Sequence, residues 1–289
     1  MEKNINPCTE KIVQIENNTH CNYACWFCQN RYYVRPKRKM MDMDLFEHIL
    51  KEVRKVYTKD ELNIVTFSVY NEPTLDTYFI ERLRMMTDME FIHQFVSNGS
   101  HITKEMVDAI VEEKLNVDCF RLNIPTVNDK ECQKIMGINS EYLDMILKRL
   151  DYACEETSKA GIPISIMVNG NGTMDHKNTF YEVVDRFNQY KVDFSMSAIS
   201  NRAGMLDHII EGKIDHLYGD LNCKMNYFDN LYFGVDGNIY VCCNDYYQEY
   251  NFGNIKDSSL EELLKSEERD SMVRKYITDG CRHCSLAVR

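Results

Sequence analysis

Short apolar runs alternate with amphipathic segments over the first two thirds of the chain. The apolar runs have the length of buried strands: Ile12–Ile15, Ile64–Val69, Phe91–Val96, Cys119–Ile124, Ile164–Val168 and Val192–Met196. The segments between them repeat apolar residues every three or four positions, as helices that cover a sheet do: Leu45 to Val56, Lys104–Lys114, Ser140–Lys159 and Asp175–Tyr190. Asp42 or Asp44 is placed to cap the first of these helices. The alternation predicts six βα units around a parallel sheet.

The pattern changes beyond about residue 215, where short aromatic-rich strands replace the βα rhythm. Tyr232–Val235 and Asn238–Val241 flank Asp236-Gly237, which is a hairpin signal. A helical stretch, Ser259–Ser266, follows before two cysteines near the end of the chain. We therefore predict two units, residues 1–214 and residues 215–289.

Charge and hydropathy exclude several classes of protein. The 289 residues include 45 acidic and 34 basic side chains, a formal net charge of -11. This is the wrong sign for tracking a phosphate backbone, so no nucleic-acid partner is expected. The chain has no apolar run of about 18 residues, and its first residues lack the apolar stretch of a signal peptide. We expect a cytoplasmic protein that is not inserted in a membrane.

Three of the twelve cysteines, Cys21, Cys25 and Cys28, form a CxxxCxxC motif in the loop directly after the first strand. Ligands of parallel α/β sheets bind at this end of the strands. Three thiolates leave one iron of a [4Fe–4S] cluster open to a small chelating molecule. The alternative is a zinc site, which would need a fourth Cys or His, and His20 is expected on the opposite strand face from Cys21.

At these residues the chain resembles the radical S-adenosylmethionine (SAM) superfamily. The resemblance implies a partial (β/α)6 TIM-like barrel, a [4Fe–4S] cluster whose open iron binds SAM, and reductive cleavage of SAM to a radical that abstracts a substrate hydrogen. It also implies that Phe27, before the third cysteine, packs near the adenine.

The resemblance extends to polar residues after the other strands, which it implies as SAM contacts: Asn71, Glu72, Pro73, Asn98, Arg121, Asn123, Asn169 and Arg202. Tyr70-Asn71-Glu72-Pro73 resembles the family's GEP-type loop, with Asn71 in place of glycine as a candidate side-chain ligand. Many relatives carry an arginine near Ile135–Gly137, and its absence here makes Arg121 the candidate for the SAM carboxylate. Arg202 is expected to be buried and therefore to need an anion, for which three partners stay open: the SAM carboxylate, an acidic substrate or a glutamate of the barrel.

A second set of cysteines, Cys223, Cys242, Cys281 and Cys284, resembles a SPASM or twitch domain. The resemblance implies one auxiliary [4Fe–4S] cluster, because the cysteines that a full SPASM domain carries after the CxxC are missing from this sequence. Cys243 competes with Cys242 as a ligand, and a structural zinc ribbon is the alternative. Four protein ligands leave no open iron, so electron transfer suits this cluster.

The resemblance predicts radical oxidation or rearrangement of a small molecule, with the auxiliary cluster as electron acceptor. The alternatives are a peptide-modifying radical SAM enzyme and, remotely, a non-catalytic iron–sulfur electron carrier. A reducing partner such as flavodoxin or ferredoxin is implied. The basic run from Arg31 to Lys39 is either a solvated loop or a docking site for that partner or an anionic substrate. Cys119 is either a hydrogen-atom donor at the site or a core residue.

Overall fold

The computed structural model describes residues 11–35, 38–210 and 221–289. Its core is a nine-stranded sheet in the order β10-β9-β8-β1-β2-β3-β4-β5-β6, in which β1 to β6 run parallel to their neighbours. These six strands are β1 Ile12–Ile15, β2 Ile64–Thr66, β3 Ile92–Ser97, β4 Val117–Asn123, β5 Ile164–Gly170 and β6 Val192–Ala198. All six predicted strands are confirmed, and the partial (β/α)6 barrel with them.

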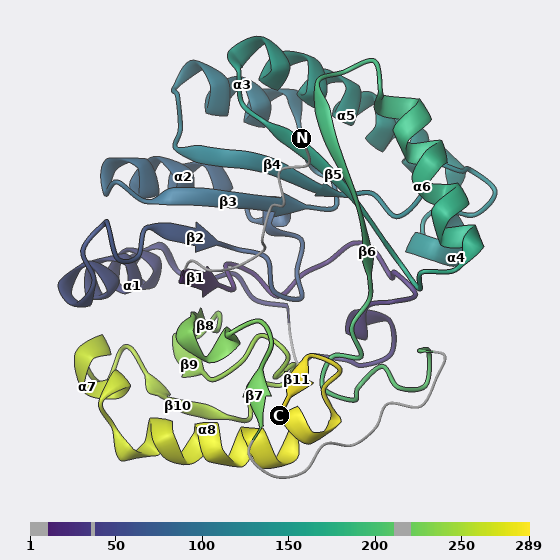
Figure 1. The fold of residues 1–289 in the computed structure, drawn as a ribbon. Helices are drawn as coiled ribbons and strands as arrows, with labels where there is room; N and C mark the ends of the chain where they lie inside the picture. The colour runs from purple at the N-terminus through teal and green to yellow at the C-terminus, as the bar shows by residue number, and fades with distance from the viewer. Residues whose placement is uncertain (1–10, 36–37, 211–220) are drawn as a thin grey trace.

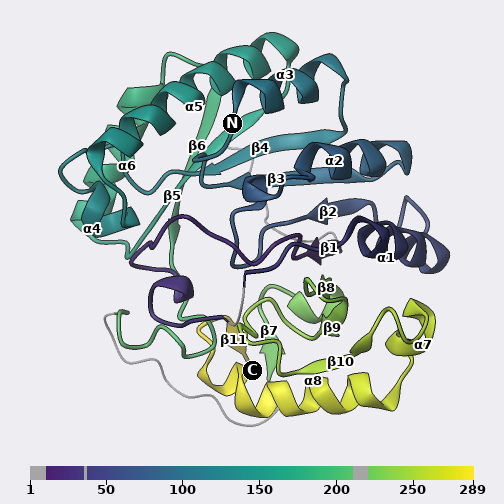
Figure 2. The ribbon, with the colours of Figure 1, turned by 180° about the vertical axis from the view of Figure 1, so that it is seen from behind.

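Six helices follow the strands and cover the outer side of the sheet, as Figures 1 and 2 show. They are α1 Met43–Val56, α2 Phe79–Asp88, α3 Lys104–Glu112, α4 Cys132–Met136, α5 Ser140–Ala160 and α6 Met174–Phe187. Asp42 caps α1 by accepting a hydrogen bond from the Asp44 N–H. The sequence analysis did not predict α2 or the five-residue α4, and a helix as short as α4 shows too little periodicity to be recognised.

The two faces of the parallel strands differ sharply in burial. On β5, Ile164, Ile166 and Val168 are buried on one face, whereas Ser165, Met167 and Asn169 alternate with them and are only half-buried. Met167 and Asn169 line a cavity inside the barrel. The apolar core therefore lies between sheet and helices, and the barrel interior is left to polar groups and a ligand.

The C-terminal unit continues the barrel sheet instead of standing apart from it. Strand β8 (Leu231–Phe233) pairs in parallel with β1, with Val13 opposite Leu231, and β9 (Asn238–Tyr240) and β10 (Asn251–Asn254) add antiparallel strands. The predicted hairpin is confirmed: Gly237 has φ +90° and donates its N–H to the Gly234 carbonyl.

The remaining elements of this unit hold its cysteines and close its outer side. They are β7 Asn222–Cys223, β11 Ala287–Val288, α7 Leu260–Leu264 and α8 Glu267–Asp279, with short 3-10 helices at Tyr227–Asp229 and Cys281–His283. Two further 3-10 helices, Gln29–Arg31 and Pro73–Leu75, lie in the barrel unit. In Figure 1, α8 lies along β10 on the side away from the barrel. The predicted boundary between residues 214 and 215 lies outside the described residues. Within the described ranges, no helix is both long and apolar enough to span a bilayer.

Candidate active site

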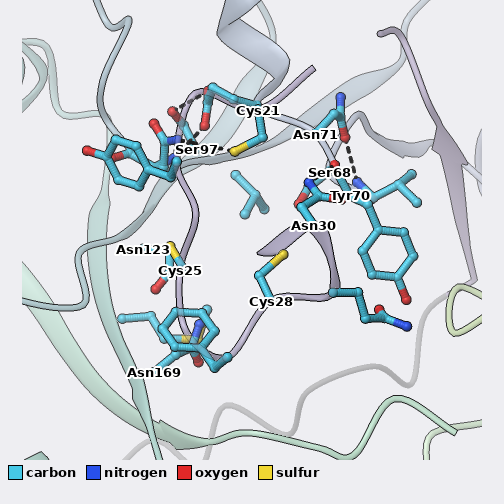
Figure 3. A pocket seen from close by; sticks show the side chains of 18 of the residues that line it. Cys21, Cys25, Cys28, Asn30, Ser68, Tyr70, Asn71, Ser97, Asn123 and Asn169 are labelled. Atoms are coloured by element: carbon cyan, nitrogen blue, oxygen red, sulfur yellow. Dashed lines mark hydrogen bonds between the residues drawn. The ribbon is translucent and has the colours of Figure 1, made fainter. Parts of the chain in front are cut away.

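The three cysteines of the first motif face one cavity of about 200 Å³ at the carboxyl ends of the barrel strands (Figure 3). Cys25 is buried, and Cys21 and Cys28 are half-buried. Backbone turns shape the loop, with the Cys28 N–H donating to the Cys25 carbonyl at 3.0 Å. His20 does not line this cavity. The loop therefore presents three thiols, without an adjoining histidine, to one space.

The donor set of this loop fits an iron–sulfur cluster better than a single metal ion. Burial, and to a smaller extent the Glu72 carboxylate, raise the pKa of the Cys21 thiol to about 12, and burial also raises the pKa of Cys25 and Cys28. The free thiols therefore stay protonated until a metal replaces the protons. In the part of the chain that the structure describes, no three Cys, His, Asp or Glu side chains are close enough to bind one ion. Thiolates spread around a four-iron cluster do not need that closeness.

A short backbone pairing with the end of α4 holds the cluster loop in place. The Ala24 N–H donates to the Met136 carbonyl at 2.9 Å, and the Trp26 N–H donates to the Ile135 carbonyl at 3.0 Å. The stretch from Ile135 to Gly137, which lacks the arginine of many relatives, therefore supports the loop through its backbone.

Arg31 and Gly137 complete this support. The Arg31 guanidinium donates to the carbonyls of Ala24 and Lys134, each at 3.1 Å. Gly137 ends α4 with φ +75°, and a Cβ atom added there would lie 2.9 Å from the Ala24 side chain. Only glycine allows both this conformation and this approach.

Glu72 connects the loop after β2 to the loop after β3. Its buried carboxylate accepts hydrogen bonds from the Ser97 hydroxyl (2.7 Å), the Thr74 hydroxyl (2.6 Å) and the Asn98 N–H (2.6 Å). Burial raises the pKa of this carboxyl group. The side chain thus positions Asn98 at the cavity wall.

The Asn71 side chain shapes its own loop. Its Oδ1 accepts from the Val69 N–H at 2.9 Å, the contact dashed in Figure 3, and its Nδ2 donates to Asn17 at 2.9 Å. Pro73 begins a 3-10 helix and does not line the cavity. The structure therefore brings Asn71 and Glu72 to the cavity, and Pro73 supports them from behind.

The far wall of the cavity carries the remaining predicted contacts. Phe27, Asn98, Asn123 and Asn169 all line it. The Asn123 Oδ1 atom is buried and has no hydrogen-bond partner, which is costly unless a ligand supplies a donor. This atom is the clearest sign that the cavity is built for a polar ligand.

The structure separates the two predicted arginines. Arg121 does not line the cavity, and its guanidinium pairs with both Asp118 carboxylate oxygens at 2.8 and 2.9 Å. The structure therefore does not bring Arg121 to the cavity, and its partner is Asp118 of the same strand. Cys119 also lies outside the cavity lining.

Arg202, by contrast, does line the cavity, where it follows β6. It is exposed, not buried as expected for pairing inside the barrel, and its hydrogen bond is to the Asn244 Oδ1 at 3.5 Å. Among the described residues no Asp or Glu pairs with it, which argues against the barrel glutamate as its partner.

The second set of cysteines gathers from three separate segments. Cys223 lies on β7, opposite Ala287 of β11, and Cys281 and Cys284 flank a 3-10 turn. Burial raises the pKa of Cys281, and the neighbouring thiols of Cys242, Cys284 and Cys223 raise it further. The four predicted ligands therefore lie together in the fold.

Cys243 lies next to this set and contacts the Cys242 thiol. Its carbonyl accepts a hydrogen bond from the Tyr70 hydroxyl at 2.8 Å. Tyr70 also lines the first cavity, so one side chain connects the two cysteine sites. The sequence analysis missed this role, although Tyr70 directly precedes the recognised Asn71-Glu72-Pro73 loop.

Most of the described basic run after the cluster loop is exposed, as expected of a solvated loop: Arg31, Arg38 and Lys39 lie at the surface, and Arg35 is half-buried. The Arg35 guanidinium binds the buried Glu16 carboxylate and lies 5.3 Å from the Tyr246 ring centroid. Lys39 pairs with Asp236 of the hairpin at 2.6 Å. Arg35 and Lys39 therefore connect the segment after the cluster loop to β1 and to the C-terminal unit. Lys37 lies outside the described residues.

Comparison with known proteins agrees with this arrangement. The model of the radical SAM superfamily matches residues 18–184, more than half of the chain, and that of SPASM, an iron–sulfur cluster-binding domain, matches residues 223–285. These matches show that the cofactors are a [4Fe–4S] cluster and SAM in the barrel, together with auxiliary iron–sulfur binding in the SPASM domain. They leave the non-catalytic electron carrier without support.

Individual relatives are distant but span nearly the whole chain. A tungsten-containing aldehyde ferredoxin oxidoreductase cofactor-modifying protein of Pyrococcus furiosus is 22% identical over 96% of this chain and 87% of its own length. An S-adenosyl-L-methionine-dependent 2-deoxy-scyllo-inosamine dehydrogenase of Niallia circulans is 22% identical over 95% of this chain and 92% of its own length.

Among solved structures, Streptococcus suis SuiB bound to the precursor peptide SuiA superposes with a TM-score of 0.69. It is 17% identical, and the match covers 96% of this chain and 70% of that chain, so it shows the fold alone. The family matches carry the identification. This chain belongs to the radical SAM superfamily and is a radical SAM enzyme of oxidoreductase type with a C-terminal SPASM domain.

Proposed function

We propose that this enzyme oxidises or rearranges a small molecule in the cavity between its two cysteine sites, with one auxiliary cluster as electron acceptor. When bound, the first cluster and SAM supply a one-electron cleavage that ends in abstraction of a substrate hydrogen atom and release of 5′-deoxyadenosine. The observation that carries the proposal is the position of this cavity. It is lined by Cys21, Cys25 and Cys28, and Tyr70 on its wall donates a hydrogen bond to the carbonyl of Cys243, beside the second site.

The chain's own side chains divide the work of holding SAM. Asn123, whose Oδ1 lacks a partner, and Asn169 offer amide groups on the far wall, and Phe27 offers an apolar ring. Asn71 and Glu72 keep the opposite loop in shape, so that its backbone reaches the ligand. Arg202, the cation among the lining residues, lies on the side of the cavity toward the second cysteine site, where it donates to Asn244.

For the second site we propose Cys223, Cys242, Cys281 and Cys284 as ligands of a single cluster. The Cys242 thiol raises the pKa of both Cys281 and Cys284, whereas the Cys243 thiol contacts Cys242 and lies beside Arg202. Cys242 is therefore the better fourth ligand. A reducing partner such as flavodoxin or ferredoxin would supply the electron to the first cluster.

Peptide modification is the second candidate, and one observation favours it. A cavity of about 380 Å³ adjoins the first one at Asn169 and is lined by Trp26 and Tyr32, with Arg31 and Lys134 near them. Together the two cavities offer a longer surface than a small cyclic substrate needs. Replacing Thr179, which lines this second cavity from α6, with Trp should leave small-molecule turnover intact but weaken turnover of a peptide substrate.

The test is anaerobic reconstitution followed by dithionite reduction with SAM. About eight irons per chain are expected in the wild type, and about four in a Cys21/Cys25/Cys28→Ala variant that forms no 5′-deoxyadenosine. A wild type that binds zinc in place of iron and does not cleave SAM would overturn the proposal. About eight irons in the triple variant would show that the ligands are assigned wrongly.

A further inference from the structure

The turn after β6 has an unusual backbone. Arg202, Ala203 and Gly204 have φ values of +51°, +55° and +89° in succession. Side chains other than glycine rarely adopt this left-handed conformation, and two such residues in a row persist only where surrounding contacts hold them. The turn is thus held in a geometry that the local sequence does not favour.

The contacts that hold this turn come from the final CxxC loop, about 80 residues away in sequence. Asn201 is fully buried, and its Oδ1 accepts from the Ser285 N–H at 2.8 Å. Its Nδ2 donates to the His283 carbonyl at 2.5 Å and to Asp207 at 2.8 Å. The Asn201 N–H donates to the Ser285 hydroxyl at 3.2 Å. One asparagine therefore locks the turn onto the loop that carries Cys281 and Cys284.

Locked in this way, the turn directs Arg202 into the gap between the two cysteine sites. The side chain lines the first cavity together with Cys28 and Tyr70. Its guanidinium donates to Asn244 Oδ1 at 3.5 Å, and the Asn244 Nδ2 lies 3.9 Å from the Cys284 sulfur. The Asn244 N–H lies 3.4 Å from the Cys242 sulfur. The Asn244 residue therefore lies between the positive charge of Arg202 and the sulfurs of Cys242 and Cys284.

The charge of Arg202 is not neutralised within the described structure. Its electrostatic neighbours include the Tyr70 hydroxyl and the thiols of Cys243 and Cys28, and none of the carboxylates in the described ranges forms an ion pair with it. A cluster ligated by thiolates is anionic and gains a further negative charge on reduction. A nearby cation stabilises the reduced form more than the oxidised form.

We propose that Arg202 is an electrostatic positioning residue that raises the reduction potential of the auxiliary cluster and so favours transfer of the substrate's second electron to it. The inference rests on the proposed function. In that oxidation one substrate C–H hydrogen atom ends in 5′-deoxyadenosine, one electron passes to the oxidised auxiliary cluster, and one proton leaves to solvent. Hydrogen-bond donors and net charge near the sulfurs are the means by which proteins set such potentials.

The experiment isolates the auxiliary cluster in the full chain. In a Cys21/Cys25/Cys28→Ala background, the midpoint potential is measured by redox titration followed by electron paramagnetic resonance. Arg202→Gln should shift the midpoint to a more negative potential, and Arg202→Lys should restore most of the wild-type value. Arg121→Gln is the matched control, because Asp118 already neutralises Arg121 outside the cavity, and it should leave the midpoint unchanged.

An unchanged midpoint in Arg202→Gln, with the cluster present at wild-type iron content, overturns the inference. If the same variant instead weakens SAM binding in the chain with all its cysteines and leaves the midpoint unaltered, the guanidinium belongs to the SAM carboxylate and the inference is also overturned. A triple-alanine background without iron would contradict the auxiliary cluster itself, so failure of the proposed function is distinguishable from failure of the inference.

Discussion

The two cysteine sites differ in how their ligands are supplied and in what surrounds them. The first takes its thiols from one stretch, Cys21–Cys28, and faces a cavity with an unpartnered amide oxygen at Asn123. The second collects thiols from segments far apart in sequence, and buried tyrosines pack around it: Tyr70, Tyr232 and Tyr276. A local loop beside a cavity suits exchange of a small ligand, whereas a site closed by packing suits storage of an electron.

The largest expected effect comes from removing ligands of the second site. Cys281→Ala with Cys284→Ala should lose about four irons per chain and abolish substrate oxidation while SAM cleavage continues. Thermal unfolding should also occur at a lower temperature, because the free energy of metal binding contributes to folding. Iron content, 5′-deoxyadenosine yield and a melting curve check these outcomes.

Cys154→Ala is the control for this variant, since Cys154 is a buried thiol of α5 away from both sites. It should keep all of the iron. Loss of SAM cleavage in the double variant, with the first cluster still loaded, would mean that the second site is also needed for SAM cleavage, which would contradict the proposal.

The next effect concerns the support of the first loop. Gly137 and Gly161 end helices with nearly the same left-handed φ, +75° and +73°, but only Gly137 has a neighbour that an added Cβ would strike. Each change to valine should lower the free energy of unfolding by about 1–2 kcal/mol through backbone strain. Gly137→Val must also displace Ala24, and we expect about tenfold or greater loss of SAM cleavage.

Urea unfolding and the rate of 5′-deoxyadenosine formation separate these two effects. Gly161→Val should be destabilised yet cleave SAM at the wild-type rate per bound cluster. Equal cleavage rates for the two variants would show that the α4 backbone does not position the cluster loop.

A smaller effect is expected at the unpartnered oxygen of Asn123. Asn123→Leu removes an acceptor whose only use is toward a ligand, so the Kd for SAM should rise about tenfold, which corresponds to about 1.4 kcal/mol. The free energy of unfolding should not fall, because no hydrogen bond within the protein is lost. Equilibrium dialysis and urea unfolding test both statements, and unaltered SAM affinity would remove Asn123 from the binding site.

The smallest effect is expected at Tyr276, whose buried hydroxyl lies beside the Cys242 thiol. Tyr276→Phe should shift the auxiliary midpoint slightly to a more negative potential, since one donor near a sulfur is lost. SAM cleavage should not change. Tyr181→Phe, at an exposed tyrosine on α6, is the control, and identical midpoints in both variants would show that the hydroxyl does not act on the cluster.

Several features could be predicted from the sequence because their signals are local. The six strands follow from apolar runs, and the hairpin follows from Asp236-Gly237, whose geometry a glycine makes possible. The CxxxCxxC spacing indicated the first site because all three ligands lie within one loop. Even Asn123 was recognised, from its position at the carboxyl end of a predicted strand.

The two arginines show where local reasoning stopped. Arg121 was named as the candidate for the SAM carboxylate, but its guanidinium pairs with Asp118 and does not line the cavity. Arg202 enters it because the Asn201 contacts to His283 and Ser285 lock the turn after β6. Asp118 is only three residues from Arg121, so that pair could have been weighed from the sequence, whereas the contacts of Asn201 come from about 80 residues away.

The sequence by itself therefore determined the βα order, the hairpin and the first set of candidate cysteine ligands, since each depends on residues close together in the chain. The second set was named through the family resemblance, because its cysteines lie on segments far apart in the sequence. Only the tertiary structure decided that β8 extends the barrel sheet beside β1, that Tyr70 links the two sites, and which arginine reaches the cavity. These features depend on contacts between segments that lie far apart in the sequence, and such contacts exist only after the chain has packed.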